Sequence, residues 1–368
     1  MHQDKKRATT RILYAPVAGG QGSGEQRRCE AIIESVSRTN PCIRHALIGP
    51  VKPRVDGVQW FPLTTSPTRN PTAIVDAMVQ FKPDWIVFDG NTIQVPLKFA
   101  KRAGIGTIFI ASRPKGRRKA LSPRRLFWLD WVWLVNPLPD QQALGWFESL
   151  MLKLCRRTSW RIWSSIHSKP DQDAAQRRLD DLGLKPGRYL LLCPGGGGQC
   201  VNGQPITALM QDVACGTSAI TGWPALVVGC DSESHEHVHC IPQVSQSELL
   251  ALVGYSRACL VGGGSLVTQA LMEGGHCAAA GWQSEQRDRV FALAHEGLVI
   301  PADANVNSMS AALVKAACDG IERNVMRSQS HHRFSNGVEE IAAILATSPF
   351  VHQRARKRTR RSFALVSP

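Results

Sequence analysis

The stretch VGGGSLVTQALMEGGHCAAAGWQSEQRDR, from Val261 to Arg289, decides the fold of this chain. An apolar strand-like segment ends at Val261, and a run of glycines then leads into a helical pattern that stops at Gly274. A second apolar segment, Ala278 to Gly281, and a polar loop follow. A glycine turn that leads into a helix leaves backbone N–H groups without intrahelical partners, and these groups commonly bind phosphate. The stretch therefore predicts a strand–turn–helix–strand unit with an anion site, although any α/β protein contains units of this kind.

The rest of the chain repeats the same alternation of strand and helix patterns, which is typical of parallel sheets covered by helices. We predict the strands Arg11–Val17, Ile43–Ile48, Val58–Phe61, Asp84–Phe88, Thr107–Ala111 and Leu129–Val135 in the first half, and Tyr189–Cys193, Ala225–Val228, Val238–Ile241 and Cys259–Val261 in the second. The sequence thus predicts an α/β fold of two Rossmann-like domains that face a cleft.

Changes in composition give the expected domain boundaries. Residues 1–140 form the first domain, 141–175 a basic, Trp-rich connector, 176–345 the second domain and 346–368 a basic tail. The connector interleaves apolar residues such as Trp146, Trp160 and Trp163 with arginines and lysines. Two interpretations fit it: its apolar face packs on the core, or it lies on a membrane surface.

Composition excludes several classes of protein. With 43% hydrophobic and 20% charged residues in 368, the chain is long and apolar enough for two packed cores. Its eleven cysteines are scattered singly, without the two-residue spacing of a zinc or redox site. The longest apolar stretch, Leu126 to Val135, contains Asp130 and is too short to span a bilayer. We expect a cytoplasmic protein that is soluble or peripheral to the membrane.

The net charge of +15 is concentrated in two runs, Lys115 to Arg125 and Arg354 to Arg361. Such runs attract polyanions: nucleic acid, anionic lipid headgroups or phosphorylated substrates. The alternative for the tail is solvated charge that only aids solubility.

The stretch that opens at Val261 resembles the nucleotide-binding half of GT-B glycosyltransferases. Gly262, Gly263 and Gly264 supply the turn of that family, and Gly274 and the pair Glu285-Gln286 match its pattern. Two positions depart from the pattern. Gln269 replaces a glutamate that accepts hydrogen bonds from the ribose hydroxyls in the family, and His276 replaces a proline. The resemblance implies a UDP-sugar donor that lies against the second domain.

A second resemblance lies near the amino terminus. Gly22, Gly24, Arg28 and Cys29 match a loop of the nucleotide-sugar hydrolase in the pseudaminic acid pathway. They also resemble the glycine loop of the N-acetylglucosaminyltransferase that forms lipid II. Where the relatives have a histidine near the reacting carbon, this chain has Glu25. A carboxylate can act as the base, or it can simply stabilise a helix N-terminus.

Asp89 follows a predicted buried strand and is expected to point into the same cleft as an acceptor-binding residue or base. The alternative is a local turn with Gly90. His235, His237 and His239 alternate along the chain, but without a fitting acidic or cysteine partner they make a poor metal site. We therefore expect metal-independent chemistry, in which helix N-termini and basic side chains offset the leaving-group charge. The expected basic side chains are Arg113, Lys115 and Arg287.

Together these features predict a glycosyltransferase that moves a sugar from a nucleoside-diphosphate donor to an unidentified acceptor, without a bound cofactor or metal. The catalytic candidates are Glu25 and Asp89, and the donor-binding candidates are Gly22, Gly24, Gly196, Gly197, Gly198, Gln199, Gly262, Gly263, Gly264, Ser265, Gln269, Gln283 and Gln286. The basic middle segment favours a lipid-linked or phosphorylated acceptor. Two alternatives stay open: a nucleotide-sugar hydrolase, and a non-catalytic binding protein of the same fold.

Overall fold

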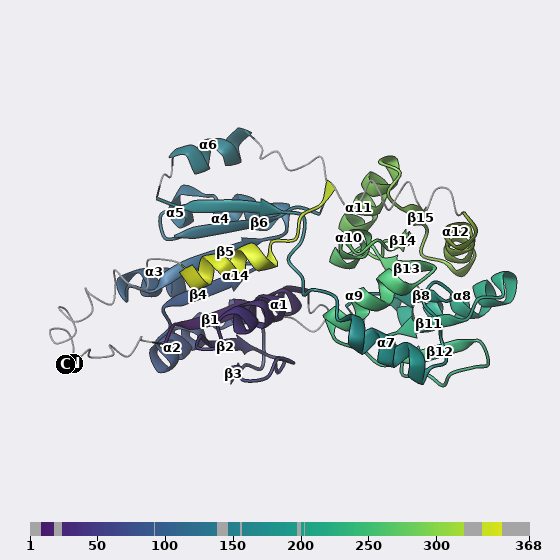
Figure 1. Ribbon diagram of the computed structural model, residues 1–368. Helices are drawn as coiled ribbons and strands as arrows, with labels where there is room; N and C mark the ends of the chain where they lie inside the picture. The colour runs from purple at the N-terminus through teal and green to yellow at the C-terminus, as the bar shows by residue number, and fades with distance from the viewer. Residues whose placement is uncertain are drawn as a thin grey trace.

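The protein consists of two α/β domains, each built on one parallel sheet (Figure 1). The computed structural model describes residues 9–17, 24–91, 93–137, 146–154, 157–196, 200–201, 203–319 and 333–347. Within these residues no helix has the length and apolar character needed to cross a bilayer.

The first sheet has seven parallel strands in the order β3-β2-β1-β4-β5-β6-β7. They are β1 (Arg11–Pro16), β2 (Arg44–Gly49), β3 (Gln59–Pro62), β4 (Trp85–Asp89), β5 (Gly106–Ala111), β6 (Trp131–Val135) and β7 (Ser159–Trp163). The six strands predicted for this half are therefore confirmed to within about two residues. The inner strands β1, β4, β5 and β6 are buried on both faces, which is why they are runs of apolar residues rather than alternating patterns.

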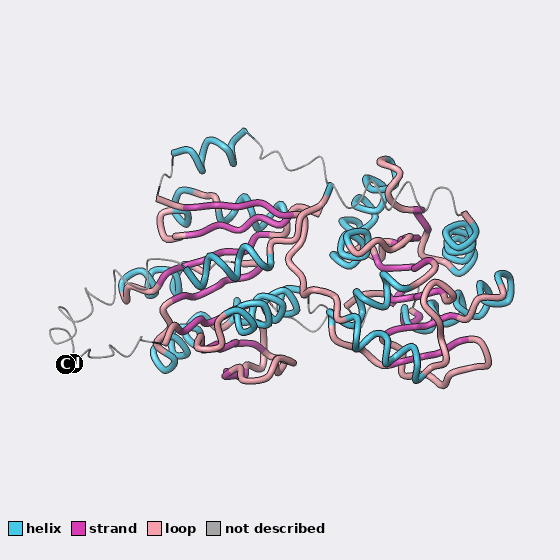
Figure 2. Tube along the Cα trace, in the orientation of Figure 1, coloured by secondary structure: helices cyan, strands magenta, loops and turns pink. Residues whose placement is uncertain are grey.

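Helices cover both faces of the first sheet (Figure 2). One face packs on α1 (Gly24–Thr39) and α14 (Val338–Thr347). The other face packs on α2 (Pro71–Phe81), α3 (Gln94–Arg102), α5 (Pro123–Leu126) and α6 (Trp146–Leu154). A short helix, α4 (Pro114–Ala120), follows β5.

The second sheet has six parallel strands in the order β12-β11-β8-β13-β14-β15. They are β8 (Leu190–Cys193), β11 (Ala225–Val228), β12 (Val238–Ile241), β13 (Ala258–Gly262), β14 (Cys277–Ala280) and β15 (Ile300–Ala302). On one face lie α7 (Gln172–Asp181), α9 (Gln246–Tyr255), α10 (Ser265–Met272) and α11 (Ser284–His295), and on the other α8 (Ile206–Thr221) and α12 (Val306–Cys318). A two-stranded ribbon, β9 (Cys200–Val201) with β10 (Gln204–Pro205), precedes α8. The prediction of two Rossmann-like domains is confirmed.

Two elements lie across the boundaries expected from sequence. The range 141–175 was expected to be a connector, but β7 within it pairs with β6 and extends the first sheet. Helix α14 falls in the range assigned to the second domain, yet Val338, Ile341 and Leu345 are buried in the first-domain core. Neither placement is a local property, because β7 is defined by its hydrogen-bonded partner and α14 by the face that it covers.

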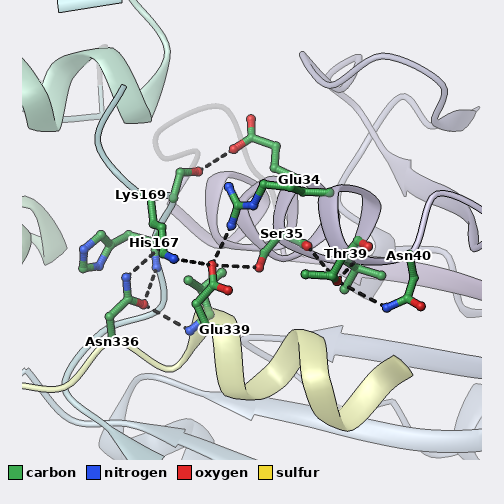
Figure 3. Close-up of polar contacts among 12 residues, drawn as sticks. Glu34, Ser35, Thr39, Asn40, His167, Lys169, Asn336 and Glu339 are labelled. Atoms are coloured by element: carbon green, nitrogen blue, oxygen red, sulfur yellow. Dashed lines mark hydrogen bonds and ion pairs between the residues drawn. The ribbon is translucent and has the colours of Figure 1, made fainter. Parts of the chain in front are cut away.

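The chain passes between the domains twice, first near Ser165 and again, on the return crossing, near Asn336. These two segments run side by side (Figure 3). Asn336 on the return crossing donates to the backbone oxygen of His167 at 3.0 Å and accepts from its N–H at 3.3 Å. At the start of α14, the Glu339 carboxylate accepts from Ser35 and Arg38 of α1 and pairs with Lys169 at 3.4 Å. The crossings are thus bonded both to each other and to the first domain.

Candidate functional site

The two domains face each other with the edges at which their strands end. In each sheet the chain order reverses beside a central strand, between β1 and β4 in the first domain and between β8 and β13 in the second. Open parallel sheets bind ligands at such switch points, because the loops there diverge and leave a crevice. A cavity of about 230 Å³ lies between these two edges, and residues of both domains line it.

Glycines form the second-domain wall of this cleft. Gly195 and Gly196 follow β8, and Gly264 precedes α10, so the two loops leave neighbouring strands as the sequence predicts. A Cβ on Gly264 would meet no atom within 4 Å, whereas one on Gly262 would lie 2.2 Å from the Pro194 oxygen. Gly262 is therefore required for the loops to pack together, and Gly264 leaves the start of α10 open to the cleft.

Side chains of α11 and of the loop between β14 and α11 hold the glycine wall in place. The Trp282 indole donates to the Pro194 oxygen at 3.2 Å, which joins the two loops. Gln286 accepts from the Trp282 N–H at 3.0 Å, and Arg289 donates to the Gly263 oxygen at 3.0 Å. Trp282, Gln283, Gln286 and Arg289 also line the cleft. The second-domain wall thus combines the glycine loops with these side chains, and Arg289 is its cation.

The first-domain wall is formed by the start of α1 and the end of β5. Glu25 lies in the first turn of α1, is 9% exposed and lines the cleft. Its carboxylate is 3.3 Å from the guanidinium of Arg113, which follows β5. This places a carboxylate and a cation side by side, opposite the glycine loops.

Asp89 lies beneath this wall and not on it. It is fully buried at the end of β4 and accepts from Arg28 Nε and Nη2 at 2.7 and 2.9 Å. Arg28 lines the cleft and also donates to Ser112 at 3.2 Å. Burial raises the pKa of Asp89 to about 6, although the Arg28 charge acts against it. The geometry therefore makes Asp89 the group that positions Arg28.

Cations of both domains meet across the cleft. Burial lowers the pKa of the Arg289 guanidinium, Glu285 opposes this shift, and the positive charge of Arg113 adds to it. Arg113 and Arg289 come from opposite walls of the cleft, and the carboxylates of Glu25 and Glu285 lie beside them. An anion in the cleft would contact both cations, and glycine loops at the ends of parallel strands commonly bind the same class of ligand.

Gln269 and His276 are the two departures from the GT-B sequence pattern, and both make internal contacts. Gln269 is 5% exposed and accepts from Gln246 at 3.2 Å, while its own N–H group reaches Ser165 at 3.5 Å. His276 is buried, and its ring bonds the Ala316 oxygen, which ties β14 to α12. Gln269 still borders the cleft, whereas His276 serves packing.

The structure brings most of the predicted site residues to this one cavity. Those that line it are Gly24, Glu25, Gly196, Gly262, Gly264, Ser265, Gln269, Gln283 and Gln286. Gly263 packs against α11, and Asp89 lies below the surface. Gly22, Gly197, Gly198 and Gln199 lie outside the described residues, as does the side chain of Lys115.

Sequence reasoning missed several of the lining residues and misplaced one cation. Ser112, Ser165 and Gln246 line the cleft from loop or helix-start positions that no local pattern distinguishes. Arg289 lines it as well, whereas Arg287, the expected cation, is exposed to solvent. The sequence does contain a signal for Arg289. It lies three residues after Gln286, so the two residues share one face of α11.

No group of three metal-ligating side chains is assembled anywhere in the described part of the chain. His235 instead contacts Gln211 at 3.4 Å.

Comparison with known proteins gives structural matches only. No family model matches the sequence, and no curated protein matches it. Os79 from O. sativa, solved in complex with UDP, superposes with a TM-score of 0.61 at 13% identity, covering 91% of this chain and 99% of that one. The spinosyn forosaminyltransferase SpnP gives 0.59 at 11% identity, covering 92% and 100%.

A candidate UDP-N-acetylglucosamine 2-epimerase from Listeria monocytogenes gives a TM-score of 0.58 at 10% identity, covering 95% of this chain and 98% of that one. These structures share the GT-B fold, and this chain has the same fold over nearly its whole length. The fold predicted from the glycine stretch is therefore confirmed.

Proposed function

We propose that the protein transfers a sugar from a UDP-sugar, or a similar nucleoside-diphosphate sugar, to an acceptor held by the first domain. The observation that carries this proposal is the glycine wall. Gly195, Gly196 and Gly264 leave backbone open to the cleft at adjoining strand ends, and Arg113 and Arg289 flank it. A diphosphate fits such a wall because it is narrow, doubly charged and an acceptor of many hydrogen bonds.

The fold matches agree with this ligand class. Two of the matched structures, Os79 and a UGT from Siraitia grosvenorii, were solved in complex with UDP. The likeness is confined to the fold, so the diphosphate assignment depends on the residues of this cleft.

The residues suggest a division of roles. Glu25 would accept the proton of the acceptor hydroxyl as that oxygen attacks the anomeric carbon of the donor. The bond from that carbon to the diphosphate oxygen would break, and its electron pair would remain on the leaving diphosphate. Arg289, Arg113 and the start of α10 would offset the growing negative charge without a metal. Asp89 would hold Arg28 at the floor of the cleft.

On this proposal the acceptor meets the first-domain wall near Gly24 and Glu25. The basic surface of that domain favours a lipid-linked or phosphorylated acceptor. Contact of both ligands with both walls would favour closure of the cleft and exclude water from the reacting carbon.

The test uses two arginines on one helix. Calorimetry with UDP on the Arg289→Gln variant should show affinity roughly 10- to 100-fold weaker than the unaltered protein, since one charge-assisted hydrogen bond is lost. Arg287→Gln removes the same charge from an exposed position of α11 and should bind UDP normally. Equal losses in the two variants, or no UDP binding by the unaltered protein, would refute the donor site.

Product analysis separates transfer from its rivals. Incubation with UDP-sugars and no acceptor should release sugar slowly, and an acceptor should accelerate donor consumption. Rapid release of free sugar without acceptor would instead identify a hydrolase, which the match at Gly24, Arg28 and Cys29 favours. Tight UDP binding with neither reaction would identify a non-catalytic protein.

A further inference from the structure

One side of the first domain exposes a cluster of large apolar side chains. Six of the eleven exposed large hydrophobic residues in the described part of the chain lie within a single stretch of it. They are Phe127, Trp146, Phe147, Leu150, Leu154 and Trp160, with exposures from 39% to 79%. Four of them are aromatic, which is unusual for a surface that only water contacts.

Three neighbouring elements form this cluster. Helix α6 buries Leu152 and presents Trp146 at 79% and Leu154 at 67% exposure. Thr158, at the start of β7, donates to the backbone oxygens of Leu126 and Leu129, so β7 begins against the end of α5. Figure 1 shows α6 beside α5 and α4 at the same side of the domain.

The charge around the cluster is of one sign. The exposed cations Arg118, Lys119, Arg124, Lys153 and Arg157 lie on α4, α5 and α6 or directly before β7. Among the described residues from 113 to 163 the acids are Asp130 and Glu148, both of which are buried and paired with a cation. Among the described residues of this stretch, no carboxylate is exposed to repel an anionic partner.

The same surface connects to the cleft. Arg113 caps the start of α4 and lines the cleft, while Arg118 and Lys119 lie at the other end of that helix. The Arg117 guanidinium then pairs with Glu148 at 3.4 Å, which fixes α6 against α4. A partner bound on this surface would lie next to the acceptor side of the cleft.

We propose that the cluster is a docking surface for an anionic lipid bilayer. Exposed tryptophan, phenylalanine and leucine can enter the headgroup region, and the exposed arginines and lysines of the same elements can pair with lipid phosphates. Nucleic acid would use the cations but leaves the aliphatic residues Leu150 and Leu154 without a partner. Binding to the bilayer needs no glycosyl transfer, so its test is independent of the proposed reaction.

Vesicle flotation tests the proposal on the full-length chain. The protein should float with vesicles of phosphatidylcholine and phosphatidylglycerol in equal parts, and not with phosphatidylcholine alone. The double variant Trp146→Ser/Leu154→Ser should partition roughly tenfold or more weakly. Arg124→Gln/Arg157→Gln should lose on the order of 25-fold, at about fivefold for each charge near the surface.

Matched double variants on the second domain serve as controls. Ile220→Ser/Phe291→Ser removes equally exposed apolar groups, and Lys185→Gln/Arg188→Gln removes two exposed cations. Both should float like the unaltered protein. Circular dichroism melting checks that every variant is folded.

Three outcomes would overturn the proposal. The first is undiminished flotation of both cluster variants, which would assign binding to other parts of the chain such as residues 346–368. The second is an equal loss in the control variants. The third is retention of a labelled oligonucleotide by a protein that binds no anionic vesicle, which would identify nucleic acid as the partner.

Discussion

At the scale of single residues, Gly262 at the end of β13 and Gly264 before α10 have different roles. Gly264→Ala should leave the free energy of unfolding within about 1 kcal/mol, because the added Cβ meets no atom within 4 Å. It should weaken UDP binding, since that Cβ projects toward the open wall. Gly262→Ala should lose several kcal/mol, because its Cβ would lie 2.2 Å from a backbone oxygen. Urea unfolding and calorimetry distinguish the two, and a destabilised Gly264→Ala would contradict this assignment.

Asp89 gives the second residue-scale prediction. Asp89→Asn leaves the Arg28 charge buried without its carboxylate partner, so the free energy of unfolding should fall by about 3–5 kcal/mol. The matched change Asp84→Asn lies in the loop before the same strand. It keeps Asp89 as the partner of Arg28 and should leave that ion pair intact. If Asp89→Asn is stable but inactive, Asp89 acts as a base in the reaction and not as the group that positions Arg28.

The buried His45 makes the free energy of unfolding depend on pH. Burial lowers its pKa to about 4, below the ordinary value of 6.5, so the folded state keeps the ring neutral. Its stabilising contribution is present above pH 6.5 and is lost as the pH falls from 6.5 toward 4, by up to about 1.4 kcal/mol per unit. His45→Gln should flatten this part of the urea-unfolding profile. An unchanged slope would assign the acid sensitivity to other groups.

At the scale of elements, α14 closes the first domain although it follows the second in sequence. Ile341→Ala removes a fully buried side chain from the first-domain core and should cost about 2–5 kcal/mol. Ile344→Ala, one turn along the same helix and only partly buried, should cost less. Hydrogen exchange should show the loss of protection in β1 and β4, and loss confined to the second sheet would refute the assignment of α14.

At the scale of the whole molecule, side chains of the first domain bridge to the second beside the cleft. Arg27 and Arg54 both donate to the Gln243 side-chain oxygen, at 2.9 and 3.0 Å. Burial lowers the pKa of Arg27, and the nearby Arg54 adds to this shift, so the bridge holds two like charges together. Gln243→Ala should therefore favour a more open arrangement. Small-angle scattering should show a larger radius of gyration, which UDP should reduce, and an unchanged radius would show that the bridge is not needed for closure.

The sequence determined the fold and the second-domain wall, because both are local in the chain. Apolar runs that end in glycine loops identify strands whose ends bind ligands, and the order of strand, turn and helix from Val261 onward needs no distant partner. Glu25 was likewise identifiable, since its position follows from the start of α1.

The tertiary structure alone decided what depends on contacts between distant residues. Asp89 and Arg28 are 61 positions apart, so only folding shows that the carboxylate serves the arginine rather than the cleft. Strand β7 and helix α14 belong to the first domain because they pack on partners distant in sequence. Arg289 and Arg113 line one cleft because the two sheets meet at their carboxyl edges. Periodicity specifies an element and its buried face, but not which other face completes the core.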